Sequence, residues 1–269
     1  MKLIFSLLGV LAMTVSAATA QVKTGIEVLR DNGFEQLKGK RVGLITNPTG
    51  IDSKMVSTID ILNAAEGVEL KALYSPEHGV RGDVTAGGSV TDYIDSRTGV
   101  KVYSIYGNTL KPTPEMLEGL DALVYDIQDI GSRSYTFIST MGKAMEAAAE
   151  NDIEMVILDR PNPLGGVRME GSLVRDGFYS FISQFPIPYV HGLTSGELAK
   201  FLNENYLEKP CRLTVIPMEG WRRDMTFDQT GLPWVLSSPH IPQASSCLFY
   251  PATGIAGELY SLNIGVGYT

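Results

Sequence analysis

The residues with the clearest chemical potential are the adjacent pair Glu77 and His78, which stand between Pro76 and Gly79. Proline fixes a backbone angle and glycine permits the left-handed conformation, so the pattern predicts an abrupt turn that holds a carboxylate in one place. A carboxylic acid held in this way can serve as a general acid. The alternative is structural, with Glu77 stabilising the amides at a helix start and His78 capping a carbonyl.

Two aspartates, Asp126 and Asp129, flank Gln128 in a second polar segment. They could act with Glu77, bind sugar hydroxyls or coordinate a divalent cation, although a site built from oxygen ligands usually needs more carboxylates than this segment offers. The alternative is that one aspartate caps the helix that follows. We predict Asp126 as the second catalytic carboxylate, and Gln128 and Asp129 as substrate-binding residues.

Three arginines, Arg81, Arg133 and Arg160, lie in the same kind of loop. The planar guanidinium group of arginine recognises an anionic substrate group better than the ammonium group of lysine does. The alternative is that each arginine pairs with a neighbouring acid. Asn162 stands between two prolines, where it either forms a turn or offers an amide donor.

Five short and nearly continuously apolar segments predict the strands that position these residues. Continuous apolar runs suit strands that are covered on both faces. The segments are Arg41–Asn47, Val68–Ser75, Val100–Tyr106, Ala122–Gln128 and Glu154–Asp159, and a sixth strand is expected at Arg212–Pro217.

Helical patterns alternate with these strands. They are expected around Val56–Leu62, after Thr113-Pro114, over Phe137–Asn151 and from Thr194, which forms a capping box with Glu197. This alternation predicts an α/β fold, with a Rossmann-like, doubly wound and mainly parallel sheet that has helices on both faces.

Four of the five strands deliver polar side chains to one rim, because the carboxyl ends of parallel strands meet at the same edge of a sheet. This gathering favours a binding or active site. The candidates are Asn47, Glu77, His78, Arg81, Asp126, Gln128, Asp129, Asp159, Arg160 and Asn162. His191, in a later loop, is a further substrate-binding candidate, with a structural role as its alternative. An aromatic group near the predicted domain junction could form a sugar-stacking wall, although such residues are more often core. Its members are Trp221, Trp234, Tyr250 and Tyr260.

The composition excludes several classes of protein. The net charge of −8 argues against a nucleic-acid partner, which would require a basic face. The loop after the first strand lacks the glycines of a dinucleotide site and no phosphate-loop lysine motif occurs, so no nucleotide cofactor is expected. Cys211 and Cys247 match no metal-ligand spacing. We therefore expect neither a cofactor nor a metal ion.

Residues 1–20 have the pattern of a signal peptide. Lys2 precedes an apolar run, and Ala18-Thr19-Ala20 fits the small-residue cleavage rule. The run is shorter than the roughly 20 residues that span a membrane, which disfavours the alternative of an anchor. We expect no membrane span after removal of the leader, and a periplasmic or secreted protein.

Proline and serine become frequent beyond Gly231, which predicts a domain junction. We expect the catalytic domain over residues 21–240. Residues 241–269 are too few to bury a core of their own, so they are interpreted as the start of an incomplete C-terminal domain.

Four ordered motifs resemble those of the exo-β-N-acetylmuramidases, a family of peptidoglycan hexosaminidases. They are LITNPTG at 44–50, SPEHGVRG at 75–82, DIQDIGSRSYT at 126–136 and DRPNP at 159–163. The resemblance runs from about Thr24 to the end of the chain. It implies a Rossmann-like domain, a smaller C-terminal domain and a cleft between them. The implied activity is release of N-acetylmuramic acid from the non-reducing ends of peptide-free glycan fragments.

The resemblance also implies roles for single residues. Glu77 matches the family's proposed catalytic residue, and Glu258 resembles a second acid that reaches the cleft. The lactyl carboxylate of muramic acid would be the partner of the arginines. The chain departs from the family at His240, where relatives usually carry asparagine. The positions that match the cleft by motif are Asn47, His78, Arg81, Asp126, Gln128, Asp159, Arg160 and Asn162.

Our hypothesis from the sequence is hydrolysis of the β-glycosidic bond of a terminal muramic acid residue, with peptidoglycan-derived saccharides as the binding partners. Glu77 would protonate the leaving oxygen, and either Asp126 or the acetamido group of the substrate would be the second participant. Two alternatives come from other classes. One is a non-catalytic periplasmic binder of cell-wall sugars, and the other is a metal-dependent hydrolase that uses Asp126, Asp129 and His78.

Overall fold

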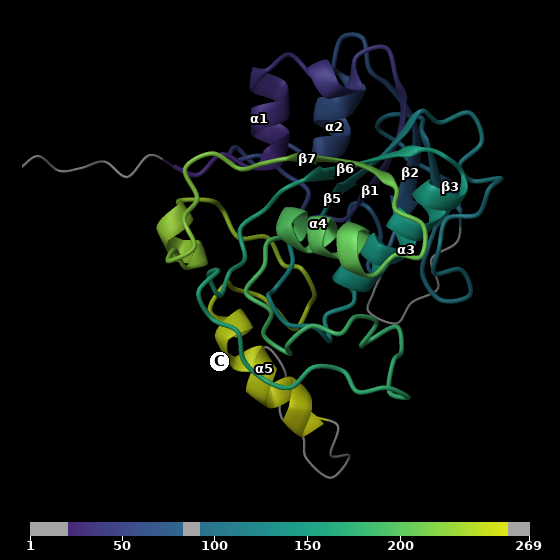
Figure 1. The fold of residues 1–269 in the computed structure, drawn as a ribbon. Coiled ribbons are helices and arrows are strands. Elements are labelled where there is room, and N and C mark those ends of the chain that lie inside the picture. The colour runs from purple at the N-terminus through teal and green to yellow at the C-terminus, as the bar shows by residue number, and fades with distance from the viewer. Residues whose placement is uncertain (1–20, 83–91, 258–269) are drawn as a thin grey trace, which may run out of the picture.

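A seven-stranded β-sheet forms the centre of the fold in the computed structural model, which describes residues 21–82 and 92–257 (Figure 1). The strand order is β3-β4-β2-β1-β5-β6-β7, and every pairing is parallel except the antiparallel one of β3 with β4. The strands are β1 (Arg41–Thr46), β2 (Glu69–Ser75), β3 (Tyr93–Ile94), β4 (Lys101–Ser104), β5 (Ala122–Asp126), β6 (Glu154–Leu158) and β7 (Arg212–Ile216).

Helices cover both faces of this sheet. Helices α1 (Gly25–Asp31) and α2 (Thr58–Asn63) lie on one face, and α3 (Phe137–Glu150) and α4 (Ser195–Asn205) lie on the other (Figure 1). The fully buried β5 contributes side chains to the hydrophobic core on each face of the sheet. Val124 packs in the cluster that includes α1 and α2, and Leu123 packs in the cluster that includes α3 and α4. Two short 3-10 helices complete these layers, η1 (Glu35–Leu37) and η2 (Phe227–Thr230). The predicted α/β, mainly parallel architecture is confirmed.

The register of the sheet brings the carboxyl ends of the central strands together. Thr46 of β1 lies beside Asp126 of β5, and Ser75 of β2 lies beside Ser104 of β4. The loops that follow these strands therefore leave from one edge of the sheet, where ligands of open parallel sheets bind.

The prediction of a helix after Thr113-Pro114 is wrong, because residues 114–119 form successive turns. The amide of Leu117 bonds the carbonyls of Thr113 and Pro114, as in a single helical turn. Gly119 then takes a φ of 74°, in the left-handed region, and a left-handed residue so close to the start stops the helix from propagating. Helix α1 and strand β3 were not expected from the sequence.

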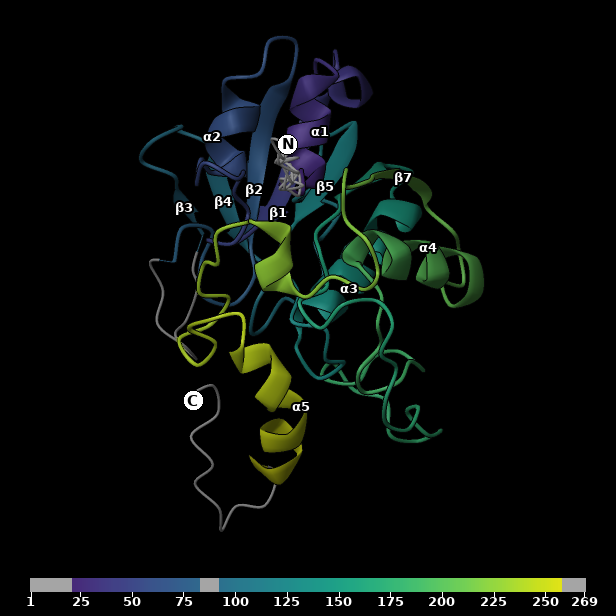
Figure 2. The same cartoon turned by 90° about the vertical axis from the view of Figure 1, so that its left-hand side faces the viewer.

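A last helix, α5 (Ser246–Gly257), lies beyond the carboxyl edge of the sheet (Figure 2). It was not expected either, since it contains Pro251 and has no clear polar face. Cys247 of α5 packs with Ile130 and Leu164, from the loops that follow β5 and β6. This packing brings α5 beside the predicted site.

The boundary proposed between residues 240 and 241 stays a prediction. Three predictions lie outside the described residues: the leader (1–20), the acid Glu258, and Tyr260 of the aromatic wall. Within the described ranges, no helix combines the length and the apolar character that crossing a bilayer requires.

Candidate active site

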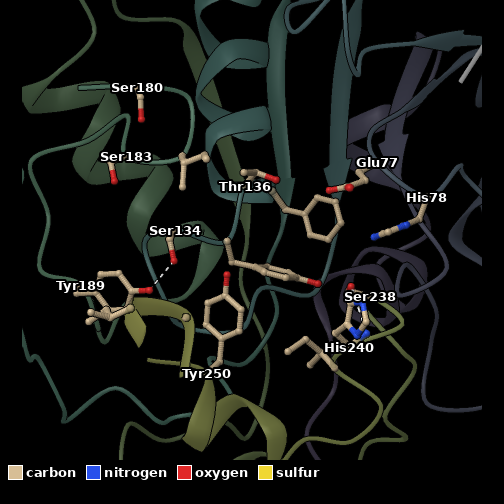
Figure 3. A pocket seen from close by; sticks show the side chains of 16 residues that line it. Glu77, His78, Ser134, Thr136, Ser180, Ser183, Tyr189, Ser238, His240 and Tyr250 are labelled. Carbon is tan, nitrogen blue, oxygen red and sulfur yellow. Dashed lines mark hydrogen bonds between the residues drawn. The ribbon is translucent and has the colours of Figure 1, made fainter. Parts of the chain in front are cut away.

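A cavity of about 690 Å³ opens at the carboxyl edge of the sheet. Glu77 and His78 lie at one end of it, and Ser180 and Ser183 lie at the other (Figure 3). Tyr250 of α5 forms part of the wall between these ends. The cavity is therefore lined by the loop after β2, the loop after β5, a later hairpin and the C-terminal helix, which are far apart in the sequence.

The half-buried Glu77 follows β2 and lines this cavity. The hydroxyl of Tyr106 donates a hydrogen bond of 2.9 Å to its Oε1 atom. Burial raises the pKa of Tyr106 to about 12, and the neighbouring Glu77 adds to the rise, so Tyr106 remains a donor at neutral pH. Among the described residues that line the cavity, Glu77 is the only carboxylate. Within residues 21–82 and 92–257, the structure thus fixes one acid, Glu77, at the cavity margin.

His78 adopts the backbone conformation that the Pro76–Gly79 pattern predicts. Its φ is 76° and that of Gly79 is 81°, so two successive residues are left-handed. This conformation is costly for a residue with a side chain, and such strain is commonly found at functional sites. His78 is buried, and within the described chain its Nδ1 atom has no hydrogen-bond partner. Burial lowers its pKa and the nearby His240 lowers it further, against the raising effect of Glu77.

Asp126 and Arg160 contact each other rather than the cavity. Arg160 donates from Nε to Oδ1 of Asp126 at 2.5 Å and from its terminal nitrogen to Oδ2 at 3.0 Å. The hydroxyl of Thr58 also donates to Oδ2, and Arg160 bonds the carbonyl of Ile51 as well. Both charged side chains are almost fully buried. The predicted second carboxylate is therefore part of a buried, two-pronged ion pair.

Arg81 is likewise held by acids of the fold. It bonds Asp95 through Nε at 2.6 Å and Asp60 through a terminal nitrogen at 2.7 Å. Arg81 lowers the pKa of Asp95 to about 2. Arg81 therefore pairs with neighbouring acids, which is the structural alternative considered from the sequence. The role of Arg81 in substrate binding stays a prediction.

Asp129 and His191 form a second buried pair. Leu193 donates its backbone N–H to Nδ1 of His191, so the ring proton of a neutral His191 resides on Nε2, which lies 3.1 Å from Oδ2 of Asp129. The amide of Gly131 also donates to Oδ2, whereas Oδ1 of Asp129 has no partner among the described residues. The adjacent Gln128 bonds the carbonyls of Asp129 and Pro161. These contacts join the loops that follow β5 and β6.

Asp159 caps helix α4 from the end of β6. It accepts the amide of Gly196 at 2.8 Å and the hydroxyl of Thr194 at 2.9 Å. Burial outweighs these hydrogen bonds and raises the pKa of Asp159 to about 6. The predicted capping box of Thr194 and Glu197 is confirmed at the same helix start.

The two asparagines stabilise turns. Asn162 accepts the amide of Leu164 and donates to the carbonyl of Leu193. Asn47 accepts both the amide and the hydroxyl of Thr49, and its Nδ2 atom is buried without a partner among the described residues. Both side chains therefore shape the rim.

The residues for the metal-dependent alternative do not converge. Asp126 pairs with Arg160, Asp129 pairs with His191, and His78 lies beside Glu77. Over residues 21–82 and 92–257, no three histidine, cysteine, aspartate or glutamate side chains are grouped as a metal site would require. The geometry gives this alternative no support.

Sequence reasoning missed Tyr106 and the wall opposite Glu77. Tyr106 ends the third predicted strand, so the strand-end rule would have found it if hydroxyl groups had been counted with acids, amides and bases. Tyr250, considered as either sugar-stacking or core, lines the cavity, and Ser134 and Tyr189 share a hydrogen bond of 2.7 Å in its wall (Figure 3). Trp234 instead packs edge-on against Phe227.

The sheet and the cavity define an α/β domain in which, among the described residues, Glu77 is the one carboxylic acid that lines the cavity at the carboxyl ends of the strands. The chain belongs to the family described as exo-beta-N-acetylmuramidase NamZ, N-terminal, whose model matches residues 42–245. The resemblance that the four motifs predicted is thereby confirmed.

Similar proteins support this membership. The peptidoglycan beta-N-acetylmuramidase NamZ of Bacillus subtilis (strain 168) is 49% identical, over 94% of this chain and 64% of its own length. Two crystal structures of DUF1343 family proteins from Bacteroides fragilis NCTC 9343 share the fold. One has a TM-score of 0.87 and 62% identity, over 93% of this chain and 63% of its own, and the other has 0.74 and 36%, over 86% and 60%. The chain thus spans less than two thirds of the length of these relatives.

Proposed function

We propose that this chain carries the catalytic domain of an exo-acting glycoside hydrolase. It releases terminal N-acetylmuramic acid from the non-reducing end of peptidoglycan fragments, and Glu77 is the general acid. The observation that carries the proposal is the position of Glu77, the single carboxylate among the described residues of the large cavity. Support comes from the family membership and from the named activity of the Bacillus subtilis relative.

The contacts of Glu77 suit proton donation. Oε1 accepts the hydroxyl of Tyr106, so in the acid form the proton resides on Oε2. Glu77 transfers this proton to the glycosidic oxygen as the bond breaks, which avoids the expulsion of an alkoxide. The carboxylate that remains keeps the hydrogen bond from Tyr106, and a bond to a charged acceptor is stronger than one to a neutral acceptor.

The second participant in our proposal is the acetamido group of the substrate rather than Asp126. Both oxygens of Asp126 are engaged by Arg160, and Thr58 adds a further donor. Attack by this carboxylate would require breaking a buried ion pair, which is unfavourable. Assistance by the substrate itself is a known exception to the scheme with two carboxylates.

We also propose that the protein acts outside the cytoplasm, in the periplasm or after secretion. The pattern of a short apolar run followed by Ala18-Thr19-Ala20 supports export. The substrate class supports the same location, because peptidoglycan is outside the cytoplasmic membrane.

The test is release of N-acetylmuramic acid from a defined peptide-free disaccharide by the wild-type chain and by Glu77→Gln. Loss of a general acid should reduce the rate on the order of 10²–10⁴-fold. The matched control is Glu66→Gln, because Glu66 is exposed and does not line the cavity. A wild-type chain that binds the disaccharide saturably but releases no product would instead support a non-catalytic binder.

A further inference from the structure

A second cavity, of about 400 Å³, lies beside the first and shares Ser180 with it. None of the predicted site residues that the structure describes lines this second cavity. Three aromatic and three polar side chains are among those that line the second cavity. They are Tyr179, Phe181, Tyr206, Gln184, Glu146 and Lys143.

A tight hairpin forms the wall between the two cavities. Ser180 and Ser183 exchange backbone hydrogen bonds of 3.3 Å and 3.1 Å, which places Phe181 and Ile182 at the tip. Ile182 lines the first cavity and Phe181 lines the second. In Figure 3, Ser180 and Ser183 lie at the end of the first cavity that is far from Glu77. A ligand that runs from Glu77 along the first cavity therefore reaches the second across Ser180.

The second cavity combines a fixed aromatic ring, Tyr206, with a solvent-exposed one, Tyr179. Tyr206 donates its hydroxyl to the carbonyl of Gln184 at 2.9 Å, and its ring packs edge-on against Phe185. Tyr179 is 42% exposed, although it lines a concave surface. An exposed ring beside a fixed ring offers flat apolar faces, which match the C–H faces of a pyranose.

Among the described residues that line this cavity, the two charged groups pair with each other. The ammonium group of Lys143 lies 2.8 Å from Glu146, so the two charges offset each other. Gln184 donates its amide to Glu146 at 3.3 Å, and its own Oε1 atom has no hydrogen-bond partner in the described part of the chain. Such a lining suits a ligand that is neutral and rich in hydroxyl donors. The described lining residues include no arginine that could bind a carboxylate with two hydrogen bonds.

We propose that the second cavity is a distal subsite for a neutral sugar residue of the leaving glycan, which extends away from the bond cleaved at Glu77. This inference rests on the proposed function, and it adds a binding site that would make longer fragments better substrates than short ones. Tyr179 supplies a stacking face, and the unpaired acceptor of Gln184 receives a sugar hydroxyl.

The experiment compares two substrates in the variant Tyr179→Ala. One substrate is a nitrophenyl glycoside of N-acetylmuramic acid, which cannot reach the second cavity, and the other is a peptide-free peptidoglycan tetrasaccharide. Loss of the ring should lower kcat/KM for the tetrasaccharide roughly tenfold and leave the glycoside unchanged. The matched control is Phe178→Ala, because Phe178 is an adjacent exposed aromatic residue, 75% exposed, that lines neither cavity.

Equal losses on both substrates, or no loss on either, would overturn the subsite. Binding of the tetrasaccharide by calorimetry to Tyr179→Ala and to Phe178→Ala separates this result from a failure of the proposed function. If no variant cleaves either substrate, weaker binding in Tyr179→Ala alone still supports the subsite. Equal binding by both variants would refute it.

Discussion

The buried pair of Asp126 and Arg160 allows a stability prediction that also tests its role. Asp126→Ala leaves the guanidinium of Arg160 without its carboxylate, in a place where the Arg160 side chain is only 5% exposed. Breaking a buried pair by removing one partner costs about 3–5 kcal/mol in the free energy of unfolding. With a urea slope of about 3 kcal/mol/M for a chain of this size, the urea midpoint should fall by roughly 1–2 M.

The assay is urea unfolding followed by circular dichroism, with Asp121→Ala as the control. Asp121 accepts two hydrogen bonds from the guanidinium of Arg41 and a third from the backbone amide of Arg41, but both side chains are well exposed, so loss of Asp121 should lower the midpoint far less than loss of Asp126 does. The double variant Asp126→Ala with Arg160→Met removes the unpaired charge and should recover much of the lost stability, and activity with it. Equal midpoints for Asp126→Ala and Asp121→Ala would refute a structural role. A double variant that regains the stability of the wild type but does not cleave the disaccharide would also refute a purely structural role.

Two further predictions concern single groups near the rim. Tyr106→Phe removes the donor to Oε1 of Glu77 and should lower kcat roughly tenfold with little change in thermal unfolding; a wild-type kcat would show that this hydrogen bond does not position the acid. Burial raises the pKa of Asp159 from 3.8 to about 6. Between these two pH values, the folded state therefore keeps a proton on Asp159 that the unfolded state has released. Stability from this group should therefore be present at low pH and be lost as the pH rises through 6, by roughly 3 kcal/mol in all. Asp159→Asn should flatten that fall in urea titrations between about pH 4 and pH 7, and an unchanged pH dependence would contradict the assignment.

Much of the fold could be predicted because its determinants are local. The central strands carry continuous apolar runs, and the capping box of Thr194 and Glu197 marks a helix start within four residues. Helix α5 could not be predicted in this way, because it is apolar around most of its circumference and contains Pro251. Its position depends on packing against Ile130 and Leu164, far away in the sequence.

The candidate site was predictable only in part, for the same physical reason. The strand-end rule found Glu77 and His78, which the structure places in the cavity. The rule identifies which loops share a rim, but not which side chains on that rim neutralise each other. The partners of Arg81 are 14 and 21 residues away, and Arg160 finds Asp126 at a separation of 34 residues. Such pairings follow from the closed three-dimensional fold and leave no pattern in the sequence.

The most direct test of Glu77 as general acid is how the effect of Glu77→Gln depends on the leaving group. A nitrophenol departs readily without a proton, whereas a sugar alkoxide needs one, so acid catalysis matters far more for the natural disaccharide. We predict that Glu77→Gln slows hydrolysis of the disaccharide by a factor at least tenfold larger than for the nitrophenyl glycoside. Equal losses on both substrates, or near wild-type cleavage of the disaccharide, would contradict the role assigned to Glu77.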